Sequence, residues 1–249
     1  RSPLFSEASR IAALARSLLP DALLVAGGVH ATTCPEETLG AGFDIVVRGE
    51  GDHALVEIAG GRRPEEILGV HWAGGQTGDR PDIQNIDPLP FPAWDLFNLD
   101  HYRQASLVAR QVPVADLESS RGCRAQCIYC TKGVFGSDYR PKSPARFVDE
   151  VEHAKAAGFA SFNLVDDSFT TLTSRSIDIC EELIRRRVDM PWTCTNGIRV
   201  ANVNEAFFRV ARRAGCRLIA FGFESGSDAV LKRIKEDFTA GFMKAGTVI

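Results

Sequence analysis

The sequence lacks several features that define whole classes of protein. No run of about eighteen consecutive apolar residues occurs, so no membrane-spanning helix is predicted. Lysine and arginine do not outnumber aspartate and glutamate, and a net charge of −3 gives no basic field for nucleic acid. No secretory segment opens the chain, and seven cysteines, an odd number, do not suggest a disulfide framework. We therefore expect a reduced, cytoplasmic protein.

Three of the seven cysteines are concentrated in one short segment. Cys123, Cys127 and Cys130 have the spacing C-x3-C-x2-C, and thiolates so placed can bind three irons of a four-iron cluster. The fourth iron then has no protein ligand and stays open to a small chelating molecule. A structural zinc site usually closes with four protein ligands and a second C-x2-C pair, which this sequence lacks. Zinc is therefore the weaker interpretation, and the spacing favours a catalytic iron-sulfur site.

Strand and helix patterns alternate after the cysteine segment. Strands separated by helices indicate right-handed crossovers and a parallel sheet. The predicted strands are 114–118, 161–165, 192–195 and 218–223, and the predicted helices are 144–157, 174–187, 204–214 and 228–235. In barrels of this type the chemistry gathers at the carboxyl ends of the strands.

Polar residues follow three of the predicted strands. They are Asp166 and Asp167 after the second strand, Asn196 and Arg199 after the third, and Glu224 and Ser225 after the fourth. Any one of them could simply cap a helix or form a turn. Because they share one rim with the cysteine segment, together they indicate a binding site.

The first hundred residues predict a separate domain. A helix over 6–19 and a short buried strand over 22–26 are followed directly by Gly27 and Gly28, where backbone can approach a large ligand closely. Glycine and proline are then concentrated between residues 74 and 112. The predicted organisation is a first domain at 1–74, a proline-rich linker at 75–112 and a second domain at 113–249.

The cysteine spacing, with aromatic Tyr129 directly before Cys130, resembles the signature of the radical S-adenosylmethionine (SAM) enzymes. The resemblance implies that Cys123, Cys127 and Cys130 bind a [4Fe-4S] cluster, and that the amino and carboxylate groups of SAM chelate its open iron. An electron from a low-potential donor such as flavodoxin or ferredoxin would cleave SAM to a 5′-deoxyadenosyl radical. That radical would take hydrogen from an unreactive carbon.

The strand-end segments resemble those of radical SAM enzymes that carry an N-terminal cobalamin-binding domain. This similarity implies that Asp166 or Asp167 faces the methionine ammonium and that Arg199 faces the carboxylate. Glu224 and Ser225 would bind the ribose hydroxyls. The charges suit a zwitterionic amino acid head group. Further predicted SAM contacts are Tyr129 and Asn196.

Segments 25–32 and 44–51 resemble the second half of that cobalamin-binding domain. The implied contacts are Gly27, Gly28 and His30 along the nucleotide tail or corrin edge, and Gly49, Glu50 and Gly51 closing the same crevice. The expected fold is α/β, a partial (β/α) barrel of the radical SAM type preceded by the second half of a Rossmann-like, flavodoxin-like cobalamin-binding domain. Both domains fall short of the family pattern at one end, so we expect a fragment of a longer protein.

Three classes of function stay open. The first is a cobalamin-dependent methyltransferase that acts on an unactivated carbon of a small-molecule or peptide substrate, with a radical cyclase or rearrangement enzyme as a close variant. The second is a radical SAM enzyme without cobalamin, although a methylthiotransferase would need more cysteines before the motif than Cys34 alone. The third is an iron-sulfur electron carrier or a zinc-stabilised module, although a carrier would fill all four iron positions.

Overall fold

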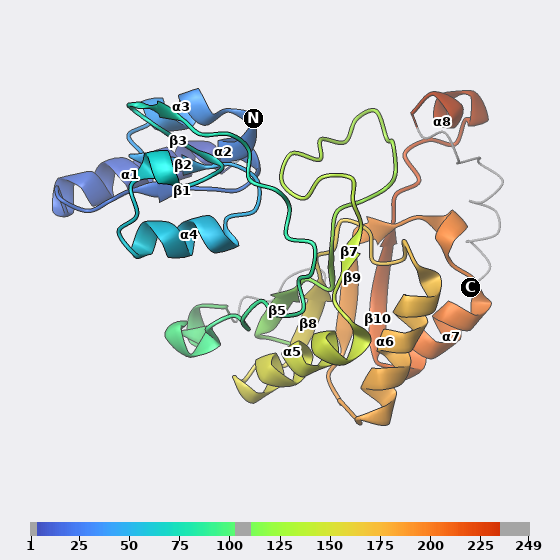
Figure 1. The fold of residues 1–249 in the computed structure, drawn as a ribbon. Helices are drawn as coiled ribbons and strands as arrows, with labels where there is room; N and C mark the ends of the chain where they lie inside the picture. Colours follow the sequence, from blue (N-terminus) through green and yellow to red (C-terminus); the bar gives the residue numbers. More distant parts are fainter. Residues whose placement is uncertain (1–3, 103–110, 235–249) are drawn as a thin grey trace. The chain divides into compact units, whose positions relative to one another are not determined.

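The structure is a computed structural model that describes residues 4–102 and 111–234 (Figure 1). The chain divides into two compact units. Unit 1 comprises the residues up to 83 together with 131–136, and unit 2 comprises 84–130 and the residues from 137 onward. The predicted boundaries after residues 74 and 112 stay predictions, and the end of the predicted second domain, after residue 234, lies outside the described residues.

Unit 1 is built on a four-stranded sheet with the order β1-β2-β3-β4. Strands β1 (Val25–Ala26) and β2 (Ile45–Val47) are parallel, whereas β3 (Val70–Trp72) and β4 (Gly75–Gln76) continue the sheet in antiparallel fashion. All three residues of β2 are buried, as expected for an inner strand that is covered on both faces. The helical elements are α1 (Phe5–Leu18), α2 (Val29–Thr33), α3 (Pro35–Gly40), α4 (Asp52–Ala59) and the 3-10 turn η1 (Pro64–Glu66).

Unit 2 contains a parallel four-stranded sheet with the order β10-β9-β8-β5. Its strands are β5 (Val114–Leu117), β8 (Ser161–Leu164), β9 (Trp192–Ile198) and β10 (Cys216–Phe221). Its α-helices are α5 (Pro144–Ala156), α6 (Thr173–Arg185), α7 (Glu205–Arg213) and α8 (Asp228–Ile234), and its 3-10 turns are η2 (Trp94–Leu96), η3 (Leu99–Tyr102) and η4 (Val200–Asn202). The α/β fold class and the predicted alternation of strand and helix are confirmed.

The sequence pattern ended the third strand of this sheet too early. It predicted 192–195, because Asn196 and Gly197 are typical turn residues, whereas β9 runs to Ile198. Pairing of Ile198 with Phe221 across a register shift carries the strand past the turn residues. Asn196 therefore lies on the strand rather than after it.

The two faces of the unit 2 sheet differ in chemistry. Helices α5, α6 and α7 cover one face (Figure 1), where Leu117, Phe162 and Trp192 belong to the hydrophobic core. On the alternate positions, Asn163 donates from its amide to the Asp116 carboxylate at 2.9 Å. Its amide oxygen accepts from the hydroxyls of Thr193 and Thr195 at 3.0 and 2.9 Å. The face away from the helices is therefore lined by a polar network.

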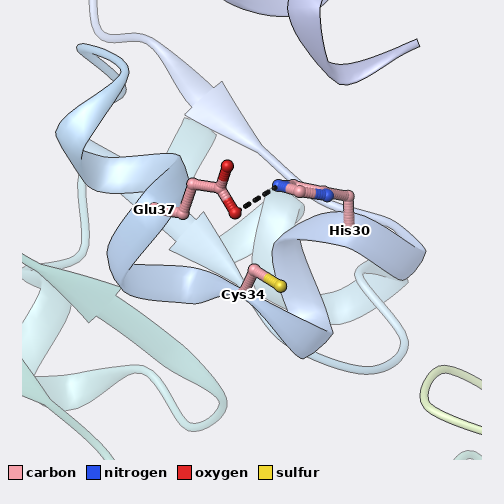
Figure 2. A group of neighbouring side chains, drawn as sticks. All are labelled: His30, Cys34 and Glu37. Atoms are coloured by element: carbon pink, nitrogen blue, oxygen red, sulfur yellow. Dashed lines mark ion pairs between the residues drawn. The ribbon is translucent and has the colours of Figure 1, made fainter. Parts of the chain in front are cut away.

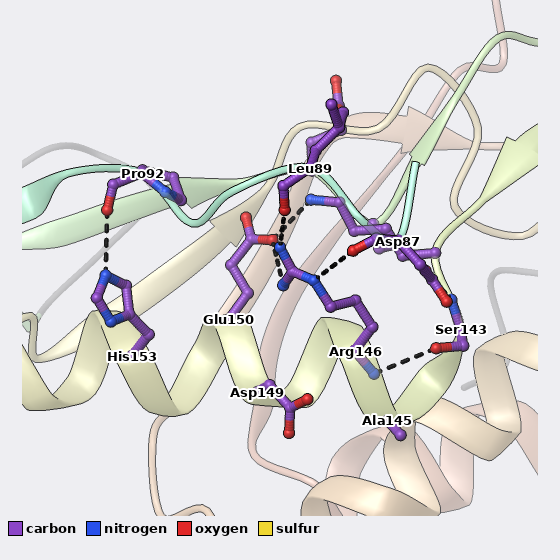
Figure 3. A network of polar contacts seen from close by, with 12 residues as sticks. Asp87, Leu89, Pro92, Ser143, Ala145, Arg146, Asp149, Glu150 and His153 are labelled. Atoms are coloured by element: carbon purple, nitrogen blue, oxygen red, sulfur yellow. Dashed lines mark hydrogen bonds and ion pairs between the residues drawn. The ribbon is translucent and has the colours of Figure 1, made fainter. Parts of the chain in front are cut away.

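The proline-rich segment at the start of unit 2 is docked on α5 (Figure 3). Arg146 donates to the backbone carbonyls of Asp87 and Leu89 at 2.9 and 2.8 Å, and its guanidinium lies 4.0 Å from the centre of the Phe91 ring. The Ser143 N–H donates to the Asp87 carboxylate at 2.7 Å. This part of the predicted linker therefore has a fixed course along one helix.

A two-stranded ribbon closes the loop that carries the motif cysteines. Strands β6 (Ser120–Arg121) and β7 (Arg140–Pro141) pair in antiparallel fashion. The loop thus leaves the ribbon at residue 122 and returns to it at residue 139.

Candidate functional site

The three motif cysteines lie on the β6–β7 loop, and none of them forms a disulfide. Cys123 and Cys127 are half-buried and Cys130 is exposed. The Cys130 N–H donates to the Cys127 carbonyl at 3.1 Å, so these two cysteines share one tight turn. One loop therefore carries all three of the thiols that are predicted to bind the cluster.

Tyr129 joins the cysteine loop to the segment that follows β10. Burial and hydrogen bonds of the Tyr129 hydroxyl to Cys127 and Glu224 raise the pKa of Tyr129. Glu224 has a φ of 60°, a left-handed conformation that costs a non-glycine residue about 1–3 kcal/mol and is typical of functional sites. Next to it, the Ser225 hydroxyl accepts the Ser227 N–H at 3.1 Å. Three of the predicted site residues are thus brought together.

The two aspartates that follow β8 have different surroundings. Asp166 is buried, and its carboxylate accepts the Ser119 N–H and the hydroxyls of Ser119 and Ser120, all at 2.6 Å. Burial raises the pKa of Asp166, and these donors oppose that shift. Asp167 is exposed and accepts the backbone N–H of Gly122, the residue before the first motif cysteine. Only Asp167 is both accessible and directly beside the cysteine loop.

Asn196 and Arg199 lie at the same edge of the sheet. The exposed Asn196 amide donates to the carbonyls of Val165 and Asp166 at 2.7 and 3.3 Å, which ties the end of β8 to β9. Arg199 follows β9 directly and is half-buried at the start of η4. The Asn196 amide therefore lies at the carboxyl end of β8, and Arg199 comes at the carboxyl end of the neighbouring β9.

The predicted glycines of unit 1 follow two neighbouring parallel strands. Gly28 comes after β1, and Gly49 comes after β2, so both lie at the carboxyl edge of the sheet. The Gly49 N–H donates to the Thr32 hydroxyl at 3.0 Å, which links the two glycine segments. Both glycines have positive φ, and a Cβ at either would meet nothing within 4 Å. The edge therefore offers bare backbone to a large ligand.

His30 lies beside this edge in a buried position. Its ring stacks on Phe5 with 3.7 Å between centroids, and its Nε2 lies 3.8 Å from the Glu37 carboxylate (Figure 2). His30, Cys34 and Glu37 form the only group of three potential metal ligands whose ligand atoms lie within 4.8 Å of one another in the described part of the chain. Sequence reasoning singled out His30 alone, although the i, i+4, i+7 spacing of the three residues on consecutive helices could have indicated the group.

The remaining predicted contacts of unit 1 border the same region. Gly27 and His30 line a hollow of about 330 Å³ together with Phe5. Gly51 precedes α4 directly. Glu50 is buried, and its carboxylate accepts the Ile83 N–H at 2.7 Å, so one of its roles is to hold the chain that leaves β4.

No helix within residues 4–102 and 111–234 combines the length and the apolar character needed to cross a membrane.

Two protein-family models match the chain. The model of the radical SAM superfamily matches residues 117–245, and the model of the B12 binding domain matches residues 3–59. The first covers the cysteine loop and three strands of the parallel sheet of unit 2, β8, β9 and β10. The second covers the glycine-lined edge of unit 1.

Curated relatives match nearly the whole chain. An uncharacterized methyltransferase, PH0819, of Pyrococcus horikoshii is 32% identical over 94% of this chain and 52% of its own length. An anaerobic magnesium-protoporphyrin IX monomethyl ester cyclase of Cereibacter sphaeroides is 28% identical over 91% of this chain and 39% of its own. The chain therefore spans about half the length of such relatives, or less.

Among solved structures, the radical S-adenosylmethionine methyltransferase TsrM from Kitasatospora setae superposes with a TM-score of 0.73. The match has 22% identity and covers 98% of this chain and 50% of that protein. This likeness confirms the fold.

Proposed function

The chain belongs to the radical SAM superfamily, and we propose that it is part of a cobalamin-dependent enzyme that transfers a methyl group to an unactivated carbon of a small-molecule or peptide substrate. Membership in the family implies a [4Fe-4S] cluster and SAM, and the B12 binding domain implies cobalamin. When bound, these cofactors supply the radical and methyl-transfer chemistry, and the protein supplies placement and protection.

The observation that carries the proposal is the gathering of charged side chains around the cysteine loop. Cys123, Cys127 and Cys130 would hold the cluster and leave one iron for SAM. Asp167, which the Gly122 N–H holds beside the loop, is the better candidate for the methionine ammonium, because the Asp166 carboxylate already accepts three donors.

The other SAM contacts follow from charge and position. The guanidinium of Arg199 suits the methionine carboxylate, and Glu224 with Ser225 suits the ribose hydroxyls. The hydroxyl of Tyr129 is hydrogen-bonded to Cys127 and to Glu224. It would therefore fix the position of a cluster ligand relative to a residue that binds the ribose. Asn196 would help to form the same rim.

Cobalamin fits the carboxyl edge of the unit 1 sheet. Backbone without side chains at Gly27, Gly28, Gly49 and Gly51 allows a broad macrocycle or its nucleotide tail to approach closely. His30, stacked on Phe5, would lie along the ligand. Glu50 would support the crevice through its bond to Ile83 rather than by direct contact.

Methyl transfer is favoured over cyclisation by the more similar relative. The 32% identical protein is named a methyltransferase, whereas the 28% identical one is named a cyclase. Cyclisation is therefore the second candidate. We propose the reducing cytoplasm as the location of the enzyme, since no disulfide joins any of the seven cysteines, all of which the structure describes, and we expect flavodoxin or ferredoxin as its electron donor.

The test begins with anaerobic reconstitution of the chain and of the full-length protein. We expect a brown protein with about four irons per chain, and release of 5′-deoxyadenosine on addition of dithionite and SAM, both of which Cys127→Ala abolishes. Hydroxocobalamin should remain with the protein through gel filtration. A colourless full-length protein that holds one zinc would refute the proposal.

The same preparation separates the two candidate reactions. With SAM that carries a deuterated methyl group, methyl transfer places the label in the product of an extract-derived substrate. Cyclisation or rearrangement consumes SAM and leaves the product unlabelled.

A further inference from the structure

A buried guanidinium lies at the base of the cysteine loop. Arg175 projects from α6, is only 7% exposed, and was not singled out by the sequence patterns. Its Nη2 donates to the Ser119 carbonyl at 2.6 Å and its Nε donates to the Lys142 carbonyl at 2.9 Å. Its Nη1 donates to the Tyr139 hydroxyl at 3.1 Å and to the Ser119 hydroxyl at 3.3 Å. One side chain thus makes four hydrogen bonds within the protein.

These four bonds reach both stems of the loop. Ser119 directly precedes β6, on the outgoing stem, whereas Tyr139 and Lys142 flank β7, on the returning stem. Between the stems lie residues 122–139, which include all three motif cysteines. The Lys142 N–H also donates to the Ser119 carbonyl at 2.9 Å, so the stems and the guanidinium share one acceptor.

Asp166 also holds the outgoing stem. Its carboxylate accepts the Ser119 N–H and the hydroxyls of Ser119 and Ser120. The positive charge of Arg175 lies close enough to favour the ionised form of this carboxylate. A buried guanidinium and a buried carboxylate are expensive to desolvate, and such groups persist where the hydrogen bonds around them are complete.

We infer that Arg175 and Asp166 are positioning residues that hold the base of the cluster-binding loop. The inference rests on the proposed function only in that it takes Cys123, Cys127 and Cys130 as the cluster ligands. A loop of this length is entropically costly to hold in one arrangement. The two residues restrict that freedom before the cluster arrives and keep the three thiolates in place once it is bound.

The first measurement requires no cofactor. Trypsin can cut the loop after the exposed Arg124, and mass spectrometry of the digest follows this cut in the cluster-free chain. Loss of a charge-assisted hydrogen bond shifts an opening equilibrium by about tenfold or more. We therefore expect Arg175→Met and Asp166→Asn to speed the cut after Arg124 by about tenfold, while the cut after the exposed Arg62 keeps its wild-type rate.

The second measurement follows the reconstituted protein. We expect Arg175→Met to release iron to a ferrous chelator about tenfold faster than the wild type, and to change the electron paramagnetic resonance spectrum and reduction potential of the cluster. Arg175→Lys keeps the charge but loses the fork of donors, so it should recover only part of both effects. Arg185→Met is the matched control, because Arg185 is on the same helix but 68% exposed, and its hydrogen bonds go to the neighbouring Glu182 rather than to the loop.

Circular dichroism identifies any variant that fails to fold. If Arg175→Met does not fold, the conservative Arg175→Lys and Asp166→Asn variants test whether the two residues hold the base of the loop. Folded variants that are cut and that release iron at wild-type rates overturn the inference. If the wild type itself binds no cluster, the proposed function fails, and the trypsin rates still decide whether these residues hold the loop.

Discussion

Adjacent side chains of the same type can have opposite roles when one faces the interior and the other faces the rim. Asp167→Asn should weaken SAM binding to the reconstituted protein by about tenfold or more, because it removes the charge expected to pair with the methionine ammonium. Its unfolding free energy should change by less than about 0.5 kcal/mol, since the amide oxygen can still accept the Gly122 N–H. Equilibrium dialysis with labelled SAM and urea unfolding measure the two quantities.

Asp166→Ala is the contrasting variant. It leaves the Ser119 N–H and the hydroxyls of Ser119 and Ser120 without their acceptor and removes a negative charge near the buried Arg175, so it should lower the unfolding free energy by about 3 kcal/mol. Equal loss of SAM affinity in both variants at unchanged stability would contradict this division of roles. The sequence could not make the distinction, because the partners of Asp166 lie some 47 residues earlier in the chain and only the folded sheet brings them together.

His71 should make unit 1 sensitive to acid. Burial and the nearby Arg48 lower the pKa of His71 below 6.5, against the smaller opposing effect of Glu36 and Asp79. As the pH falls, the unfolded chain therefore binds a proton at His71 before the folded chain does. The unfolding free energy has its full value above pH 6.5 and decreases as the pH falls toward the folded-state pKa of His71. Urea unfolding of the wild type between pH 7.5 and 5 should show this decline, no steeper than about 1.4 kcal/mol per pH unit for one proton.

His71→Phe should flatten the decline, whereas a phenylalanine in place of the exposed His53 should leave it unchanged. A wild-type pH profile in His71→Phe would show that another group causes the acid sensitivity.

At the scale of single elements, Arg146 connects a proline-rich segment to a helix. Arg146→Met removes two hydrogen bonds to the carbonyls of Asp87 and Leu89 and the contact with the Phe91 ring. We expect a loss of about 2 kcal/mol in unfolding free energy and faster hydrogen exchange in segment 84–92. Arg209→Met on α7, where the arginine is exposed and pairs only with Glu205, should cost less than about 0.5 kcal/mol. Unchanged exchange in 84–92 would mean that other contacts hold the segment.

Secondary structure was the most predictable part of the fold. Apolar periodicity is a local property, so the helices and parallel strands of unit 2 were predicted to within a few residues. The end of β9 was missed because pairing between β9 and β10, which no local pattern encodes, overrides the turn preference of Asn196 and Gly197. The course of the proline-rich segment was equally hidden, since it depends on contacts with Ser143, Arg146 and His153 of a helix more than 50 residues further along the chain.

At the scale of the whole molecule, the sequence indicated two domains but not how the chain is shared between them. Segment 131–136 follows the last motif cysteine directly, yet it belongs to unit 1. A Cβ at Gly133 would lie 3.2 Å from the Thr33 side chain, so the segment packs tightly within that unit. Part of the cysteine loop itself therefore belongs to the unit that carries the predicted cobalamin edge, which no linear pattern reveals.

Because each unit has its own hydrophobic core, cobalamin should stabilise only one of them. Calorimetry of the chain should show two transitions, and hydroxocobalamin at about 100 times its Kd should add about 2.7 kcal/mol to the unfolding free energy of unit 1 alone.

Gly28→Ala should reduce this cobalamin-induced gain in stability, since its methyl group would project into the space predicted for the ligand. Gly61→Ala is the matched control, because Gly61 also has positive φ and open space but lies outside the predicted site. Both variants should lose about 1 kcal/mol of basal stability from backbone strain. An equal reduction of the cobalamin shift in both, or a shift of both transitions, would place the ligand elsewhere.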